Sequence, residues 1–114
     1  MNNSFNALIV PAALAHPVHI KCVDLDITAR LRVLQGEIGF ISSVDWFAYL
    51  DNGGTRSAEN VRAEVLIREA GVEIEETIHG TATFLGHTSP GEESDPPRHL
   101  IRLAEQLFDM PLAA

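Results

Sequence analysis

The segment of residues 44–51, Val-Asp-Trp-Phe-Ala-Tyr-Leu-Asp, constrains the fold more than any other part of the chain. Side chains alternate between the two faces of a strand, so Trp46 lies on one face while Phe47 and Tyr49 lie on the other. Both faces are therefore apolar. A strand of this kind needs a cover on each side, and the second face needs the last helix, a second protomer or another protein.

The rest of the composition places this strand in an ordinary globular domain. The chain has 114 residues, of which 46% are hydrophobic and 21% are charged. That length supports one core but not two, so residues 1–114 form a single domain. We expect the core at residues 6–87, a linker at 88–94 and a C-terminal helix at about 95–109.

The spacing of apolar residues predicts the order ββαββαβα. This is an α+β fold with a mostly antiparallel sheet and helices packed on one face. The expected strands are residues 6–11, 18–25, 37–42, 44–51 and 79–87, with a half-exposed strand or its approach at 72–78. The expected helices are residues 26–35, 57–70 and 95–109.

Several residues mark where these elements begin and end. Ser57 or Asn60 is suited to cap the second helix, because its side-chain oxygen can accept from a free amide of the first turn. Gly71 is suited to end that helix. Asp95, which precedes two prolines, is expected to cap the last helix.

The charge balance excludes several classes of partner. Sixteen acids against eight bases give a formal net charge of -8. Phosphates would be repelled, so we expect neither general binding to nucleic-acid backbones nor docking on anionic membranes.

Features of a targeted or secreted chain are also missing from the sequence. The first residues lack a basic region, and no apolar run approaches the roughly 20 residues of a membrane span. Cys22 is the single cysteine, which excludes an intrachain disulfide and fits a reducing compartment. We expect a cytoplasmic protein of a bacterium or of a phage-infected host cell.

No catalytic, metal or cofactor site is expected. Cys22 falls on the apolar face of the second strand, where a buried, inert thiol is the usual outcome. His16 and His19 flank a proline, so their rings need not converge, and the eight residues from His79 to His87 separate those two by about 26 Å along a strand. No phosphate-binding loop and no nucleophile elbow occurs.

The acidic run Glu69, Glu73, Glu75 and Glu76 is the most pronounced surface feature of the sequence. One interpretation is a patch that imitates phosphates or meets a basic partner. The other is a solvated edge that discourages aggregation of sheets. The candidate binding residues are Trp46, Phe47, Tyr49, Glu73, Glu75 and Glu76.

Four short motifs resemble a small domain family of unknown function found in phages, plasmids and other mobile elements. The family pattern joins a helix ending in Gly-Gly, an Asn-Glu-x-Gly turn, an Asn-x-x-Ala helix start and a Gly-x-Ala strand. In this chain the corresponding motifs are Leu34-Gln35-Gly36, Asp51-Asn52-Gly53-Gly54, Asn60-x-x-Ala63 and Gly80-Thr81-Ala82. The first two depart from the pattern. The resemblance implies an accessory protein of a mobile element and brings no reaction or ligand.

Three functions remain open at this point. The first is a non-enzymatic protein-interaction module that binds another protein, such as a host factor, with a homodimer as a further option. The second is an inhibitor that imitates DNA, of the anti-restriction type. The third is a small-ligand-binding protein or enzyme with a site near residues 51–60.

Overall fold

The computed structural model describes residues 4–24, 39–50, 58–75, 77–89, 92–109 and 112. Two predicted features lie outside the described residues, namely the helix at 26–35 and the turn at 51–54. No described helix is long and apolar enough to cross a membrane.

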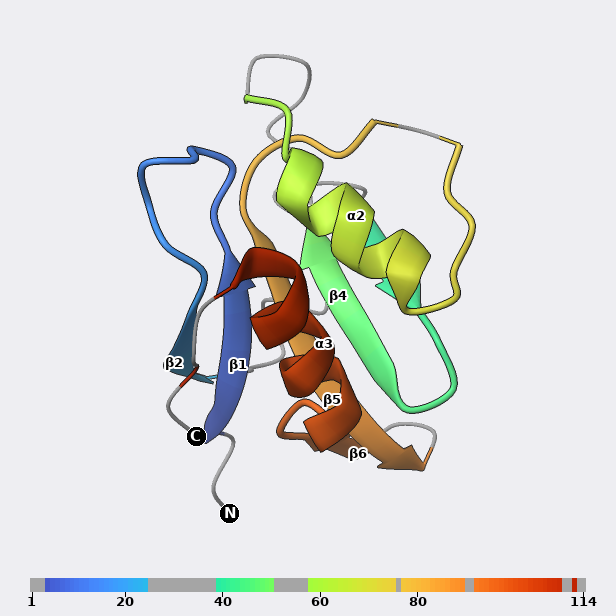
Figure 1. The fold of residues 1–114 in the computed structure, drawn as a ribbon. Coiled ribbons are helices and arrows are strands. Elements are labelled where there is room, and N and C mark those ends of the chain that lie inside the picture. The colour runs from blue at the N-terminus through green and yellow to red at the C-terminus, as the bar shows by residue number, and fades with distance from the viewer. Residues whose placement is uncertain are drawn as a thin grey trace.

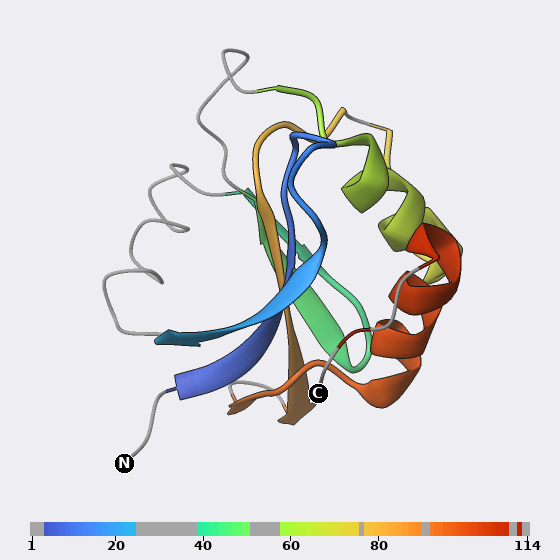
Figure 2. The same ribbon diagram turned by 60° about the vertical axis from the view of Figure 1, so that its left-hand side comes forward.

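Within the described residues, six strands form one antiparallel sheet, in the order β2-β1-β5-β4-β3 with β6 paired to β5 beside this path. The described helices, α2 (Val61–Glu69) and α3 (Arg98–Phe108), lie on the same face of the sheet (Figures 1 and 2). This confirms the α+β class. The strands are β1 (Ser4–Val10), β2 (His19–Asp24), β3 (Gly39–Ser42), β4 (Trp46–Leu50), β5 (Ala82–Ser89) and β6 (Glu92–Ser94).

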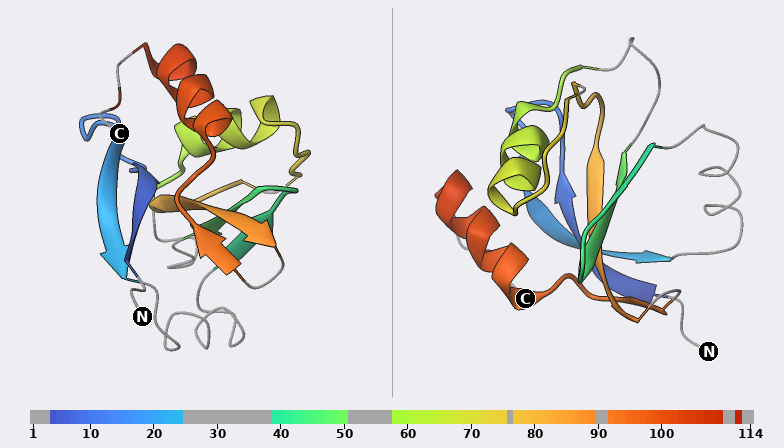
Figure 3. Two further views of the ribbon diagram at one scale, coloured as in Figure 1. Left: turned by 90° about the horizontal axis from the view of Figure 1, so that it is seen from below. Right: turned by 90° about the vertical axis from the view of Figure 1, so that its right-hand side faces the viewer.

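The strand β4 is apolar on both faces, as its sequence predicts. Trp46 packs into the main core under the helices, and Phe47 packs into a second cluster with Ala7, Ile9 and Leu85. Figure 3 places both helices on the side of the main core, so α3 does not cover Phe47. Phe47 is nevertheless only 5% exposed, so its burial requires no partner chain.

The predicted linker at residues 88–94 is wrong in part, because β6 lies within it. Strand β1 pairs with β5 only over Ala82 to Phe84, which leaves the rest of that side of β5 for β6. At Gly86 a Cβ atom would lie 2.4 Å from the backbone oxygen of Asp95. The glycine thus permits a close backbone approach that a strand pattern alone does not reveal.

The described residues between Val72 and Ile78 form no strand, so of the two forms expected for 72–78, a half-exposed strand or the approach to one, they show the approach to β5. The amide of Gly71, at φ 98°, donates to the carbonyl of Arg68, and the Val72 amide donates to that of Ile67. This pattern ends α2 as predicted and turns the chain away. Only His79 forms a bridge, to Glu59.

Two local expectations were wrong, namely that Cys22 is buried and that Asp95 caps α3. Cys22 is exposed rather than buried, as is Asn6, its cross-strand neighbour. Asp95 does not cap α3, which begins after Pro97 without a side-chain cap bond. Its carboxylate instead accepts from the backbone amide of Asn6 at 2.8 Å. An acid near a helix start therefore serves the neighbouring strand.

Asn60 joins the sheet, the helix and the returning chain through one buried side chain. Its Nδ2 donates to the carbonyls of Val10 at 2.7 Å and Gly80 at 2.8 Å. Its Oδ1 accepts from the Ala63 amide at 3.0 Å, which is the cap interaction that the sequence predicts. The residue is 0% exposed, so water cannot replace any of these bonds.

Arg62 lies two residues after Asn60, in the first turn of α2, and holds the loop between β1 and β2. Its Nη2 donates to the carbonyls of Pro11, Ala13 and His16, at 2.7, 3.0 and 2.7 Å. Desolvation by burial lowers the pKa of Arg62, yet a guanidinium remains charged at neutral pH. The loop is therefore fixed to the helix by a cation.

Two replacements of Asn60 distinguish its role as the cap of α2 from its role as donor to the carbonyls of Val10 and Gly80. Asn60→Ala should lower the free energy of unfolding by about 2–4 kcal/mol, because it removes a cap and leaves two buried carbonyls without donors. Asn60→Asp should be at least as damaging, although aspartate is a good cap, because its carboxylate faces those carbonyls. Urea unfolding measures both. A mild effect of Asn60→Asp would show that capping alone matters.

Candidate functional site

Strand β3 is an edge of the sheet, since β4 is its single neighbour in the strand order of the described residues. The amide of Ser43 donates to the carbonyl of Trp46 at 2.8 Å, and this pair continues the β3–β4 register. Hydrogen-bonded and non-hydrogen-bonded pairs alternate in an antiparallel ladder. The backbone groups of Phe40 and Ser42 therefore point away from β4, toward the open edge.

The two faces of this edge strand differ in character. Phe40 is 49% exposed, and its ring lies 5.6 Å from that of Phe47 and 5.8 Å from that of Tyr49. These rings form an aromatic ledge on the face opposite the helices. Ile41 points to the other face, where it packs against the main core.

An open pocket of about 420 Å³ lies beside the edge. Its walls come from β3 and the end of β4 on one side and from the chain after α2 on the other. Mixed apolar and polar linings of this kind suit a side chain that carries both characters. The pocket is lined by Gly39, Phe40, Ile41, Leu50, Ile74, Glu75, Thr77, Ile78 and His79.

Asn60 also holds the far wall of the pocket, which is the chain that follows α2. The backbone amide of Asn60 donates to the carbonyl of Ile78 at 2.7 Å, and the amide of Gly80 donates to that of Ala58 at 2.8 Å. Ile78 is 4% exposed and belongs to the main core. These bonds anchor the end of the wall, and the bond from the Val72 amide to the Ile67 carbonyl anchors its start, so the pocket is formed without a ligand.

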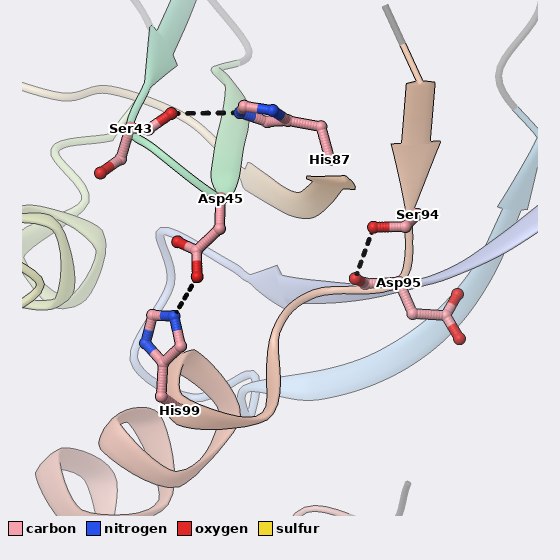
Figure 4. A network of polar contacts seen from close by, with 6 residues as sticks. All are labelled: Ser43, Asp45, His87, Ser94, Asp95 and His99. Atoms are coloured by element: carbon pink, nitrogen blue, oxygen red, sulfur yellow. Dashed lines mark hydrogen bonds and ion pairs between the residues drawn. The ribbon is translucent and has the colours of Figure 1, made fainter. Parts of the chain in front are cut away.

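The turn between β3 and β4 is held at several points (Figure 4). His87 of β5 contacts the Ser43 carbonyl through Nε2 at 3.1 Å, and its backbone amide donates to the Asp45 carbonyl at 3.2 Å. The Asp45 carboxylate lies 2.6 Å from Nε2 of His99 on α3. Ser94 and Asp95 complete the group, with the Ser94 hydroxyl donating to the Asp95 carbonyl at 3.2 Å.

This group of residues has no arrangement suited to nucleophilic catalysis. Both hydrogen bonds of His87 are to backbone carbonyls, and within this group of described residues no serine hydroxyl is hydrogen-bonded to a histidine ring nitrogen. The contacts instead fix one end of the edge strand. A fixed edge loses less conformational entropy when it pairs with another chain.

The exposed acidic residues at the end of α2 and in the chain after it form what we call the acidic rim, and among them Glu75 lines the pocket. Glu73 and Glu75 are both exposed, and no ion pair joins either of them to another residue of the described ranges. Glu69, at the end of α2, is also exposed. Glu76 lies outside the described residues. The predicted acidic run thus flanks the edge strand, a location that its sequence pattern does not indicate.

The predicted aromatic residues occupy different environments. Trp46 and Phe47 are core residues at 1% and 5% exposure, so packing accounts for both. Tyr49 is half-buried and contributes to the ledge. Sequence reasoning missed Phe40, although the unbroken apolar character of Gly39-Phe40-Ile41 in a short strand was a usable signal.

Other kinds of site find little support in the described part of the chain. No three His, Cys, Asp or Glu residues there are grouped so that they could hold a metal ion. Comparison of the chain with protein-family models, with curated proteins and with solved structures gives no match. The resemblance to a mobile-element domain family stays a prediction, and the geometry alone carries the functional argument.

The Asp45–His99 contact should position the turn more than it stabilises the fold. The two side chains are 45% and 61% exposed, so solvent screens their interaction. A double-mutant cycle with Asp45→Ala and His99→Ala, measured by urea unfolding, should give a coupling free energy below about 1 kcal/mol. A much larger value would indicate a shielded pair that supports the fold itself.

Proposed function

We propose that the protein is a non-enzymatic interaction module that binds an extended segment of another protein along the open edge of β3. The observation that carries this proposal is the outward-facing backbone of Phe40 and Ser42. An added strand would exchange hydrogen bonds with these groups, as in other cases of strand addition. The aromatic ledge and the pocket meet at this edge, where Phe40 belongs to both, so side chains of the added segment would contact them.

The charges beside the edge favour a basic partner segment. Glu73 and Glu75 lie on the chain that forms the far wall, and Glu75 itself lines the pocket. A lysine or arginine next to an apolar residue would therefore match this side. Two copies of the present chain would instead bring their acidic rims together, which disfavours self-pairing.

The length of β3 limits how tightly this edge can bind. Four residues form the strand, and each hydrogen bond contributes a net free energy of only about 0.5–1.5 kcal/mol. Short edge strands are also a common means of avoiding aggregation. We therefore expect a dissociation constant on the order of 10–100 µM, set largely by the ledge and the pocket.

Selection of peptides from a random 12-residue display library tests this function. Enriched peptides should alternate apolar residues with lysine or arginine, and in NMR titrations they should shift the amides of residues 39–42 and 72–78. Ser42→Pro should weaken binding about tenfold or more, because it removes an outward N–H without removing a bond to β4. Ser42→Thr keeps that N–H and serves as the matched control.

Four results would overturn the proposal. Peptides that bind Ser42→Pro and Ser42→Thr equally well would show that the β3 edge is not the binding site. Amide shifts confined to residues outside 39–42 and 72–78 would show the same. A library without any enriched peptide would remove the peptide-binding function. A dimer of the free protein that Ser42→Pro converts to a monomer would assign the edge to self-pairing.

Neutralising the acidic rim tests the charge of the partner segment. Glu73→Gln and Glu75→Gln together should weaken the selected peptides about five- to tenfold, since two exposed ion pairs contribute about 1 kcal/mol in total. Asp109→Asn changes one exposed charge at the end of α3 and should leave binding unchanged. Equal affinities for all variants would contradict a basic partner.

The two other functions inferred from the sequence stay predictions. An inhibitor that imitates DNA needs carboxylates aligned on one surface, whereas among Glu73 and Glu75 it is Glu75 that lines the mixed pocket beside the edge strand. The proposed ligand site near residues 51–60 falls mostly on residues outside the described ranges, and Asn60 itself is engaged in the core.

A further inference from the structure

A second open pocket lies on the face of the sheet opposite α2 and α3, above strands β2, β1 and β5. Its volume is about 600 Å³, within the range of small-molecule sites. His19, Ile9 and Thr83 lie opposite one another in register, so their side chains form a row across the three strands. The lining consists of Ile9, Pro11, His16, Pro17, His19, Lys21, Val23, Thr81 and Thr83.

The chemistry of this pocket differs from that of the chain as a whole. Lys21 is exposed on its wall, His16 and His19 lie at its rim, and none of its described lining residues is an aspartate or glutamate. The chain nevertheless has a formal charge of -8. A local cation with hydroxyl and imidazole groups around it favours an anion, since charge-assisted hydrogen bonds are the stronger ones.

The floor of the pocket adds an apolar requirement. Ile9 belongs to the second hydrophobic cluster and lies on β1, between the polar groups of β2 and β5, and Val23 of β2 packs against the same cluster. A ligand that carries an anionic head and an apolar body matches both parts. Inorganic phosphate alone would leave the floor in contact with water.

The rim is held in place from the opposite side of the sheet. Arg62 of α2 binds the carbonyls of Pro11 and His16, which fixes both ends of the loop that borders the pocket. His19 Nδ1 lies 2.9 Å from the Pro17 carbonyl. Because a carbonyl oxygen only accepts, this contact places a proton on Nδ1 and orients the ring.

We propose that this pocket binds a small organic anion, with a phosphate or carboxylate group held by Lys21 and the hydroxyls of Thr81 and Thr83. The apolar part of the ligand rests on Ile9 and Val23. This site is independent of the β3 edge, because the two share no lining residue. A negative result at one of the two sites therefore does not contradict the proposal for the other.

Four small probes test the two requirements in the intact chain by NMR titration. Phenyl phosphate and benzoate should bind with dissociation constants on the order of 1 mM and shift the amides of Lys21 and Thr83. Benzyl alcohol lacks the charge and inorganic phosphate lacks the apolar body, so both should bind at least about fivefold more weakly. The ratio of phenyl phosphate to benzoate affinity identifies the preferred head group.

A charge-removing variant locates the anion. Lys21→Met keeps the length of the side chain and should weaken phenyl phosphate about fivefold, which corresponds to an exposed ion pair of about 1 kcal/mol. Arg102→Gln removes a cation from α3 and should leave the affinity unchanged, while thermal unfolding checks that both variants fold.

The proposal would be overturned by equal binding of benzyl alcohol and phenyl phosphate, or by equal losses in Lys21→Met and Arg102→Gln. Shifts confined to residues outside the pocket would also overturn it. Absence of any shift at millimolar concentrations of phenyl phosphate and benzoate would show that the pocket is not an anion site.

Discussion

The buried side-chain amide of Asn60 connects three parts of the chain through one residue. Its nitrogen donates to the end of β1 and to the chain before β5, and its oxygen caps α2. The backbone amide of the same residue holds Ile78 in the pocket wall. An amide can do this because it offers two donors and an acceptor in one plane. The position of α2 and the shape of the candidate site both depend on it.

The residues that stabilise the sheet and the residues proposed to bind ligands lie in different parts of it. Its interior is completed by side chains from both faces, with helices over Trp46 and a second cluster around Phe47. Its exposed features lie at the margins, where β3 leaves backbone groups open and β2 borders the cationic pocket. Binding at a margin of the sheet does not lower the stability of the core, because no buried contact has to break. The contact of Asp45 with His99 fixes the turn beside β3, and Arg62 fixes the loop beside β2.

Much of the fold could be predicted because the relevant signals are local. Alternation gave the strands and the two faces of β4, and the Asn60 and Gly71 signals marked the ends of α2 within its predicted span. Errors arose where a distant segment competed for the same group. Asp95 was expected to cap α3 but accepts from Asn6, and β6 forms only because β1 leaves part of β5 open. No local pattern contains either fact.

The candidate sites show the same division. Sequence by itself determined the α+β class, the apolar double face of β4 and the acidic character of residues 69–75. Tertiary structure decided that Trp46 and Phe47 are core residues, that Phe40 lies on an open edge, and that Glu75 borders a pocket beside it. It also gathered Lys21 of β2, Thr83 of β5 and Thr81, which directly precedes β5, around one pocket. Strand order determines these neighbours, and strand order follows from contacts between residues far apart in the chain, which periodicity does not encode.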